Sequence, residues 1–157
     1  MIEERFKKVA EIAVNSIEGI RRTGIRVIEL RGRYAKMMMP LEGNINHVGM
    51  MYAGSLFTLG EFCGGIIYGV AFDVEKYYPI VKDISIRFRR PAMTDVTIEV
   101  SMSEEDAGEI QQICDENDKS DFVLDLEIKD AGGEVVALVK GTWQIRKMPE
   151  GMGNLFE

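Results

Sequence analysis

The sequence is poor in the residues that bind metals and cross-link chains. It has two cysteines, Cys63 and Cys114, far apart in the chain, and one histidine, His47. A closed zinc site needs about four nitrogen or sulfur ligands, so we expect no metal site. Two unclustered cysteines are typical of a reducing compartment, and the N-terminal stretch mixes both charge signs and lacks the apolar run of a signal peptide. We therefore expect a cytoplasmic protein.

Positive charge is also scarce. The chain has 19 Lys and Arg against 26 Asp and Glu, a net charge of −7. Nucleic-acid binding needs a clustered excess of basic residues, so we expect no nucleic-acid partner. A length of 157 residues is typical of one domain, over 1–157, that buries a core without disulfide or metal support.

There is only one long hydrophobic run, Met50–Phe72, with Glu61 as its single charge. It is long enough for a membrane span, but it holds the charge near its middle and is rich in glycine: Gly54, Gly60, Gly64, Gly65 and Gly69. Close approach of a helix to a sheet would offset the cost of these glycines, about 0.5–1 kcal/mol each. We expect a buried core helix at about 52–72 and no membrane partner.

The segments before this helix suggest a flanking helix and a strand or bent hairpin. Apolar residues recur at three- and four-residue steps over about 2–22, which predicts an amphipathic helix against the rest of the domain. Gly24 follows as a plausible C-cap. Ile25–Pro40 is rich in β-branched and long apolar residues and contains Gly32, which indicates a strand or a bent hairpin.

The second half of the chain is strand-like. Strands are expected at Pro79–Arg90, Val96–Met102, Phe122–Lys129 and Val135–Arg146. The acidic stretch Ser103–Asp121 is interpreted as a short edge strand flanked by solvated loops, and the tail from Pro149 as loosely ordered. The predicted fold class is α+β: an antiparallel sheet wrapped around one long central helix, with an N-terminal flanking helix.

Residues 46–61 carry a motif, Asn-His-Val-Gly-Met-Met-Tyr-Ala-Gly-Ser-Leu-Phe-Thr-Leu-Gly-Glu. It resembles that of hotdog-fold acyl-CoA thioesterases of the phenylacetate-pathway (PaaI-like) type, which is close to Asn-x-x-Gly-x-x-His-Gly-Gly-x-x-x-Thr-Leu-x-Asp. The matching positions are Asn46, Gly49, Gly54, Thr58 and Leu59. Three positions depart: Tyr52 replaces the histidine, Ala53 the first paired glycine, and Glu61 the catalytic aspartate. The order of elements is similar from about Val9 to Lys147.

The resemblance implies a catalytic group of Glu61, Asn46 and Gly54. Amides at the start of the central helix would hold the thioester oxyanion. Glu61, with its pKa raised by burial, would be the general base or the nucleophile, and Asn46 would orient water or the thioester oxygen. Structural roles remain open: an ion pair of Glu61 with an arginine, a turn formed by Asn46, and tight packing at Gly54. His47 is interpreted as a loop residue.

A pocket and a cofactor-binding surface follow from the same resemblance. The expected substrate pocket includes Tyr52, Ala53, Met51 and Phe57. The CoA phosphates would lie near Arg87, Arg89 and Arg90, because guanidinium groups bind phosphate in bidentate fashion. Strand alternation predicts that Arg87 and Arg89 share one face and Arg90 the other. The alternative is that these arginines only protect a solvated strand edge.

The predicted function is hydrolysis of acyl-CoA or related acyl thioesters by a homodimer or homotetramer, with CoA as part of the substrate and no separate cofactor. One alternative is a non-catalytic module that binds acyl-CoA or fatty-acyl groups, favoured by the departures at Tyr52 and Ala53. Another is a hotdog dehydratase or hydratase, for which His47 is the only available histidine. The fold does not decide between them.

Overall fold

Six strands form one antiparallel sheet in the computed structural model, which describes all 157 residues. The strand order is β1-β2-β4-β5-β6-β3. The strands are β1 (Arg26–Arg31), β2 (Tyr34–Met39), β3 (Tyr77–Phe88), β4 (Val96–Ser101), β5 (Lys119–Asp130) and β6 (Val135–Lys147). The helices are a 3₁₀ turn (Glu4–Phe6), α1 (Lys7–Asn15), α2 (Glu18–Thr23), α3 (Ala53–Ala71) and α4 (Glu104–Asn117).

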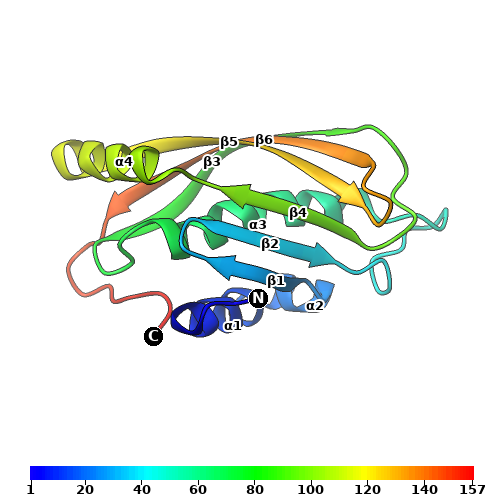
Figure 1. Ribbon diagram of the computed structural model, residues 1–157, viewed down its shortest axis with the longest axis horizontal. Coiled ribbons are helices and arrows are strands. Elements are labelled where there is room, and N and C mark those ends of the chain that lie inside the picture. Colours follow the sequence, from blue (N-terminus) through cyan, green and yellow to red (C-terminus); the bar gives the residue numbers. More distant parts are fainter.

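The sheet curves around α3, with α1 and α2 beside β1 and α4 at the end where α3 terminates (Figure 1). Alternation explains which face is buried: along β5 the even-numbered residues from Ser120 to Ile128 are buried and the odd-numbered ones are exposed. The expected α+β fold is confirmed. The segment 25–40 forms a β1–β2 hairpin, one of the two arrangements expected for it.

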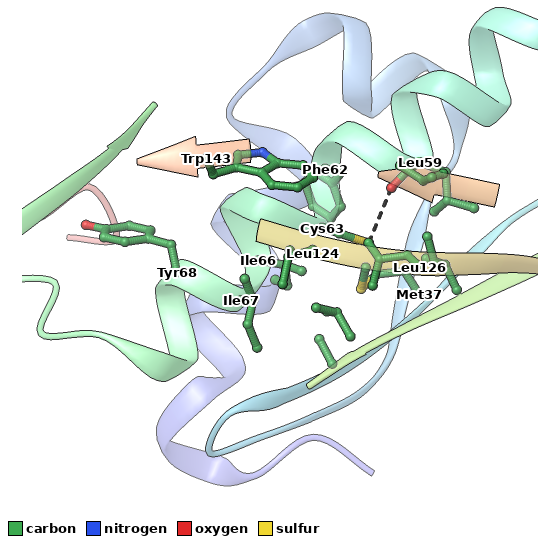
Figure 2. Packing of buried hydrophobic residues seen from close by; sticks show 14 of the residues in the cluster. Met37, Leu59, Phe62, Cys63, Ile66, Ile67, Tyr68, Leu124, Leu126 and Trp143 are labelled. Atoms are coloured by element: carbon green, nitrogen blue, oxygen red, sulfur yellow. Dashed lines mark hydrogen bonds between the residues drawn. The ribbon is translucent and has the colours of Figure 1, made fainter. Parts of the chain in front are cut away.

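The glycines of α3 allow the helix to lie directly on β6. A side chain at Gly60 would press against Val139, and one at Gly64 would overlap the indole ring of Trp143. Trp143 is fully buried, and its ring stacks on that of Phe122 at 6.2 Å between centroids. Figure 2 shows Trp143 among the other buried residues around α3. Within the most apolar 18-residue stretch of α3, 67% is buried inside the protein. The long apolar run is therefore a core helix, as expected.

Adding one methyl group at Gly64 is expected to lower the free energy of unfolding by about 3 kcal/mol, because the rigid indole cannot move aside in a packed core. Gly65 is the matched control. A Cβ at Gly65 meets nothing within 4 Å, so Gly65→Ala should raise stability by about 0.5–1 kcal/mol through its helix propensity. Chemical unfolding of both variants measures the difference. Equal stability of the two would contradict this account of α3 packing.

The flanking helix is divided into two, unlike the single helix expected over 2–22. The chain leaves helical geometry at Ile17 (φ −108°, ψ 116°), which is exposed although it belongs to the predicted apolar stripe. Asn15 and Ser16 precede this break, and both are weak helix formers. The Asn15 side chain donates back to the Glu11 carbonyl. The expected C-cap at Gly24 is confirmed, in left-handed geometry (φ 74°).

The acidic stretch 103–121 was wrongly predicted as a short edge strand, because most of it forms α4. The Ser103 hydroxyl accepts a hydrogen bond from the Asp106 amide at 3.0 Å and caps the helix. Acidic residues fill the first turn, where they interact favourably with the helix dipole. Ala107 and Cys114 are buried on one face. These sequence signals favoured a helix, but the high charge obscured the apolar spacing.

The C-terminal tail is held more closely than expected. Asn154 donates to the Glu75 carboxylate at 2.6 Å. The ring of Phe156 packs 6.0 Å from that of Tyr68, between centroids, and lies against Gly69 of α3. The tail therefore covers the C-terminal end of α3.

Candidate active site

The first turn of α3 has two amides without hydrogen-bond partners. The N-cap residue Tyr52 supplies no side-chain cap, and its carbonyl accepts from the amides of Ser55 and Leu56. The amides of Ala53 and Gly54 donate to no group in the protein. They lie at the positive end of the helix dipole, so they can bind an anionic or strongly polarised oxygen.

A cavity of about 290 Å³ lies beside this helix end. Its lining comes from the loop before α3, the start of α3 and the chain after β3: Asn46, Met50, Met51, Ala53, Leu56, Phe88, Arg89, Arg90, Pro91 and Ala92. Five of the residues predicted for the site are thus brought together, namely Asn46, Met51, Ala53, Arg89 and Arg90. The wall is mostly apolar, with the two arginines at its border.

Glu61 lies outside this cavity, on the side of α3 that the sheet leaves open. Gly54 and Thr58 share this side, because Thr58 lies four residues after Gly54 and three residues before Glu61. Glu61 is half-buried, and burial raises the pKa of its carboxyl group. No ion pair in the protein involves Glu61, so the alternative pairing with Arg87 or Arg89 is absent within the chain.

Two of the predicted pocket residues do not line the cavity. Tyr52 and Phe57 are 58% and 39% exposed. The ring of Tyr52 folds back over Gly54, where any added side chain would overlap it. The open side of α3 therefore carries two aromatic rings near its start.

The three arginines do not follow the predicted alternation. Strand β3 ends at Phe88, and the amides of Arg89 and Arg90 both donate to the Val136 carbonyl, at 2.8 and 3.2 Å. Arg89 and Arg90 consequently border the same cavity, and Arg90 is paired with Glu134 at 3.2 Å. Arg87 lines a different, charged hollow on the outer face of the sheet. The prediction that Arg87 shares a face with Arg89 is wrong.

Asn46 holds the loop that leads to α3. Its side-chain oxygen accepts hydrogen bonds from the amides of Val48 and Met50, at 3.0 and 3.2 Å. This is the turn-forming arrangement considered as an alternative for Asn46. Its side-chain NH₂ group donates to no protein group. His47 is exposed in the same loop.

Sequence reasoning missed two buried polar residues at the site, Asn44 and Ser55. They are 5% and 7% exposed, and the Ser55 hydroxyl donates to the Asn44 side-chain oxygen at 2.8 Å. A serine inside an otherwise apolar helix turn was the available signal. Its partner lies eleven residues away, so no local pattern linked the two.

Comparison with known proteins shows the family to which this chain belongs. A family described as a domain of unknown function (DUF4442) matches residues 3–145. No curated protein matches the sequence. A Pseudomonas aeruginosa protein of unknown function, described as a probable thioesterase, is 37% identical; the match covers 88% of this chain and 93% of that one, with a TM-score of 0.85.

Two further structures share the fold at low sequence identity. A Haemophilus influenzae thioesterase is 14% identical, with 91% of each chain covered and a TM-score of 0.70. The Escherichia coli PaaI protein from the phenylacetic acid degradation operon is 16% identical, with 90% of this chain and 96% of that one covered and a TM-score of 0.59. The likeness to PaaI is therefore distant. The chain belongs to the DUF4442 family and has the thioesterase-like hotdog fold.

Proposed function

We propose that this protein hydrolyses acyl-CoA thioesters at the cavity beside the start of α3. The observation that carries the proposal is the pair of free amides, on Ala53 and Gly54, next to a mostly apolar cavity. A thioester carbonyl needs such donors when negative charge develops on its oxygen. The family relative described as a probable thioesterase supports the same activity.

In the proposed reaction, Glu61 removes a proton from water while the water oxygen attacks the thioester carbon. The resulting oxyanion accepts hydrogen bonds from the free α3 amides. Its collapse breaks the carbon–sulfur bond, and the protonated Glu61 returns the proton to the leaving thiolate. The products are a carboxylic acid and free CoA. The raised pKa of Glu61 suits this exchange, because a base works best when its pKa approaches the working pH.

One copy of the chain holds the two groups well apart along α3. Ala53 and Glu61 are eight residues apart in one straight helix, which separates them by about 12 Å along the axis. The oxyanion lies about 3 Å from its donors, and the base lies about 3 Å from the water that attacks the same carbon. We therefore propose that each site combines the amides of one copy with Glu61 of a second copy.

The uncovered surfaces support such an assembly. Strand β3 is an edge of the sheet, and half of its 12 residues are exposed while only Tyr77 is buried. Exposed edges invite pairing. Large apolar residues are exposed around the helix start: Ile45, Val48, Tyr52, Phe57, Phe88 and Met93. We propose a two-fold dimer with two equivalent sites, from which a tetramer can be built.

Arg89→Ala is expected to raise KM for acyl-CoA by about tenfold and to change kcat little, because a remote phosphate contact contributes to ground-state and transition-state binding alike. Arg90→Ala should act in the same direction but less, since Arg90 is already paired with Glu134. Arg87→Ala is the control, because Arg87 lies on the outer sheet face. Steady-state kinetics measure the effect. Equal KM values for the Arg89 and Arg87 variants would remove the phosphate contact from the proposal.

A second candidate function is acyl-CoA binding without hydrolysis. The Tyr52 ring over Gly54 favours it, because the ring narrows the approach to the helix end. Product analysis by mass spectrometry separates the candidates. Incubation with a panel of saturated and unsaturated acyl-CoAs should give free acid and CoA. Tightly bound but intact thioester would identify a binding module, and a hydrated acyl-CoA would identify a hydratase.

A further inference from the structure

We infer that Asn44 and Ser55 are positioning residues that fix the first turn of α3 against the rest of the fold. This inference rests on the proposed function and adds to it the groups that hold the catalytic amides in place. Neither side chain borders the cavity, so both would act through the helix rather than on the substrate.

Asn44 joins three elements through its side chain and backbone. Its NH₂ group donates to the carbonyls of Thr23, at the end of α2, and Pro40, just after β2, both at 2.8 Å. Its side-chain oxygen accepts from the Ser55 hydroxyl on α3. Its carbonyl accepts from the Tyr52 amide at 2.7 Å. A buried polar group is costly unless hydrogen-bonded, and here both side-chain polar atoms have partners.

Ser55 is the α3 end of this link. Its hydroxyl makes the only side-chain hydrogen bond that joins the first turn of α3 to another element. Ser55 follows directly after Gly54, so a shift of Ser55 moves the free amides of Ala53 and Gly54 with it. The Tyr52 amide is tied to Asn44 as well, so the helix start is held on both sides of the two free donors.

This placement has consequences for catalysis because oxyanion donors act over a narrow range, about 2.7–3.1 Å from the developing charge. Substrate binding depends on the cavity wall and the arginines, which Asn44 and Ser55 do not contact through their hydrogen bonds. A loosened helix start should therefore lower kcat far more than it alters KM. A residue that only stabilises the fold would change the unfolding temperature and leave kcat of the folded enzyme unaltered.

Ser55→Ala tests the inference with one hydrogen bond removed. Ser120→Ala is the matched control, because Ser120 is also buried, 4% exposed, at the start of β5 near α4. Ser55→Thr keeps the hydroxyl and serves as the rescue variant. We expect kcat of Ser55→Ala to fall about tenfold with KM within about twofold, since small misplacement of reacting groups is costly. Ser120→Ala and Ser55→Thr should keep kcat within about threefold of the wild type.

The measurement is steady-state release of free thiol from acyl-CoA by the four proteins, each checked for folding by its thermal transition. If Ser55→Ala and Ser120→Ala show the same kcat, the positioning role is overturned while the proposed hydrolysis stands. If Ser55→Thr is as slow as Ser55→Ala, the hydroxyl is not the cause and the inference also fails. If the wild type releases no thiol from any acyl-CoA, the proposed function fails and this inference falls with it.

Discussion

Replacing Glu61 by glutamine is expected to lower the turnover of acyl-CoA thioesters by about 10²–10⁴-fold, because glutamine keeps the shape of the side chain but cannot accept the proton of the attacking water. Glu61 suits this role because it is half-buried, has no ion-pair partner within the chain, and has a pKa raised by burial. Free-thiol release under saturating substrate measures the change. Wild-type turnover in a folded Glu61→Gln protein would remove Glu61 from the mechanism.

The same variant should be as stable as the wild type or more stable at neutral pH. Burial raises the folded-state pKa of Glu61 above its unfolded value. The contribution of Glu61 to stability is therefore fully present below the unfolded pKa and is lost as pH rises through the folded pKa. Glutamine does not ionise, so its advantage should grow over that interval. Thermal unfolding of both proteins between pH 4 and 8 tests this sign, and a clear loss of stability in the variant would indicate a structural ion partner instead.

Ala53→Pro is expected to lower kcat by about 10²–10³-fold, because it removes one of the two free amides at the helix start. The change suits the local backbone. Proline is favoured at the first position of a helix, and the preceding residue, Tyr52, is already extended (φ −59°, ψ 133°). Stability should therefore be retained.

Ala53→Ser is the control for the Ala53→Pro variant, because it changes the side chain and keeps the amide. Thiol-release kinetics with thermal unfolding of both variants separate loss of the donor from damage to the fold. If Ala53→Pro retains wild-type kcat, the Ala53 amide is not an oxyanion donor.

Most of the fold was predictable because its elements carry regular apolar spacing. The alternation in β5 indicated a half-buried strand. The long apolar run of α3, with its central charge and its glycines, indicated a buried core helix rather than a membrane span. The helix in segment 103–121 was harder to predict, because its capping serine and acidic first turn are short signals inside a highly charged stretch. The break at Ile17 directly follows Asn15 and Ser16, two weak helix formers whose effect a periodic stripe does not reveal.

The candidate site was predictable only where a motif marks it. The resemblance over residues 46–61 identified Asn46 and Ala53, which border the cavity. The faces of the arginines could not be predicted, because Arg89 and Arg90 share one acceptor, the Val136 carbonyl, after the strand has ended. The bond between Asn44 and Ser55 joins a loop to a helix and exists only in the folded chain.

The central claim, a thioesterase site shared between two copies, is tested most directly by combining two inactive variants. Co-expression of Ala53→Pro and Glu61→Gln chains with different tags allows the mixed dimer to be purified. One of its two sites would carry both defects, and the other would have an intact amide from one chain and an intact Glu61 from the other. We predict that the mixed dimer recovers about half of the wild-type turnover. A mixed dimer as inactive as its two parents would contradict the shared site.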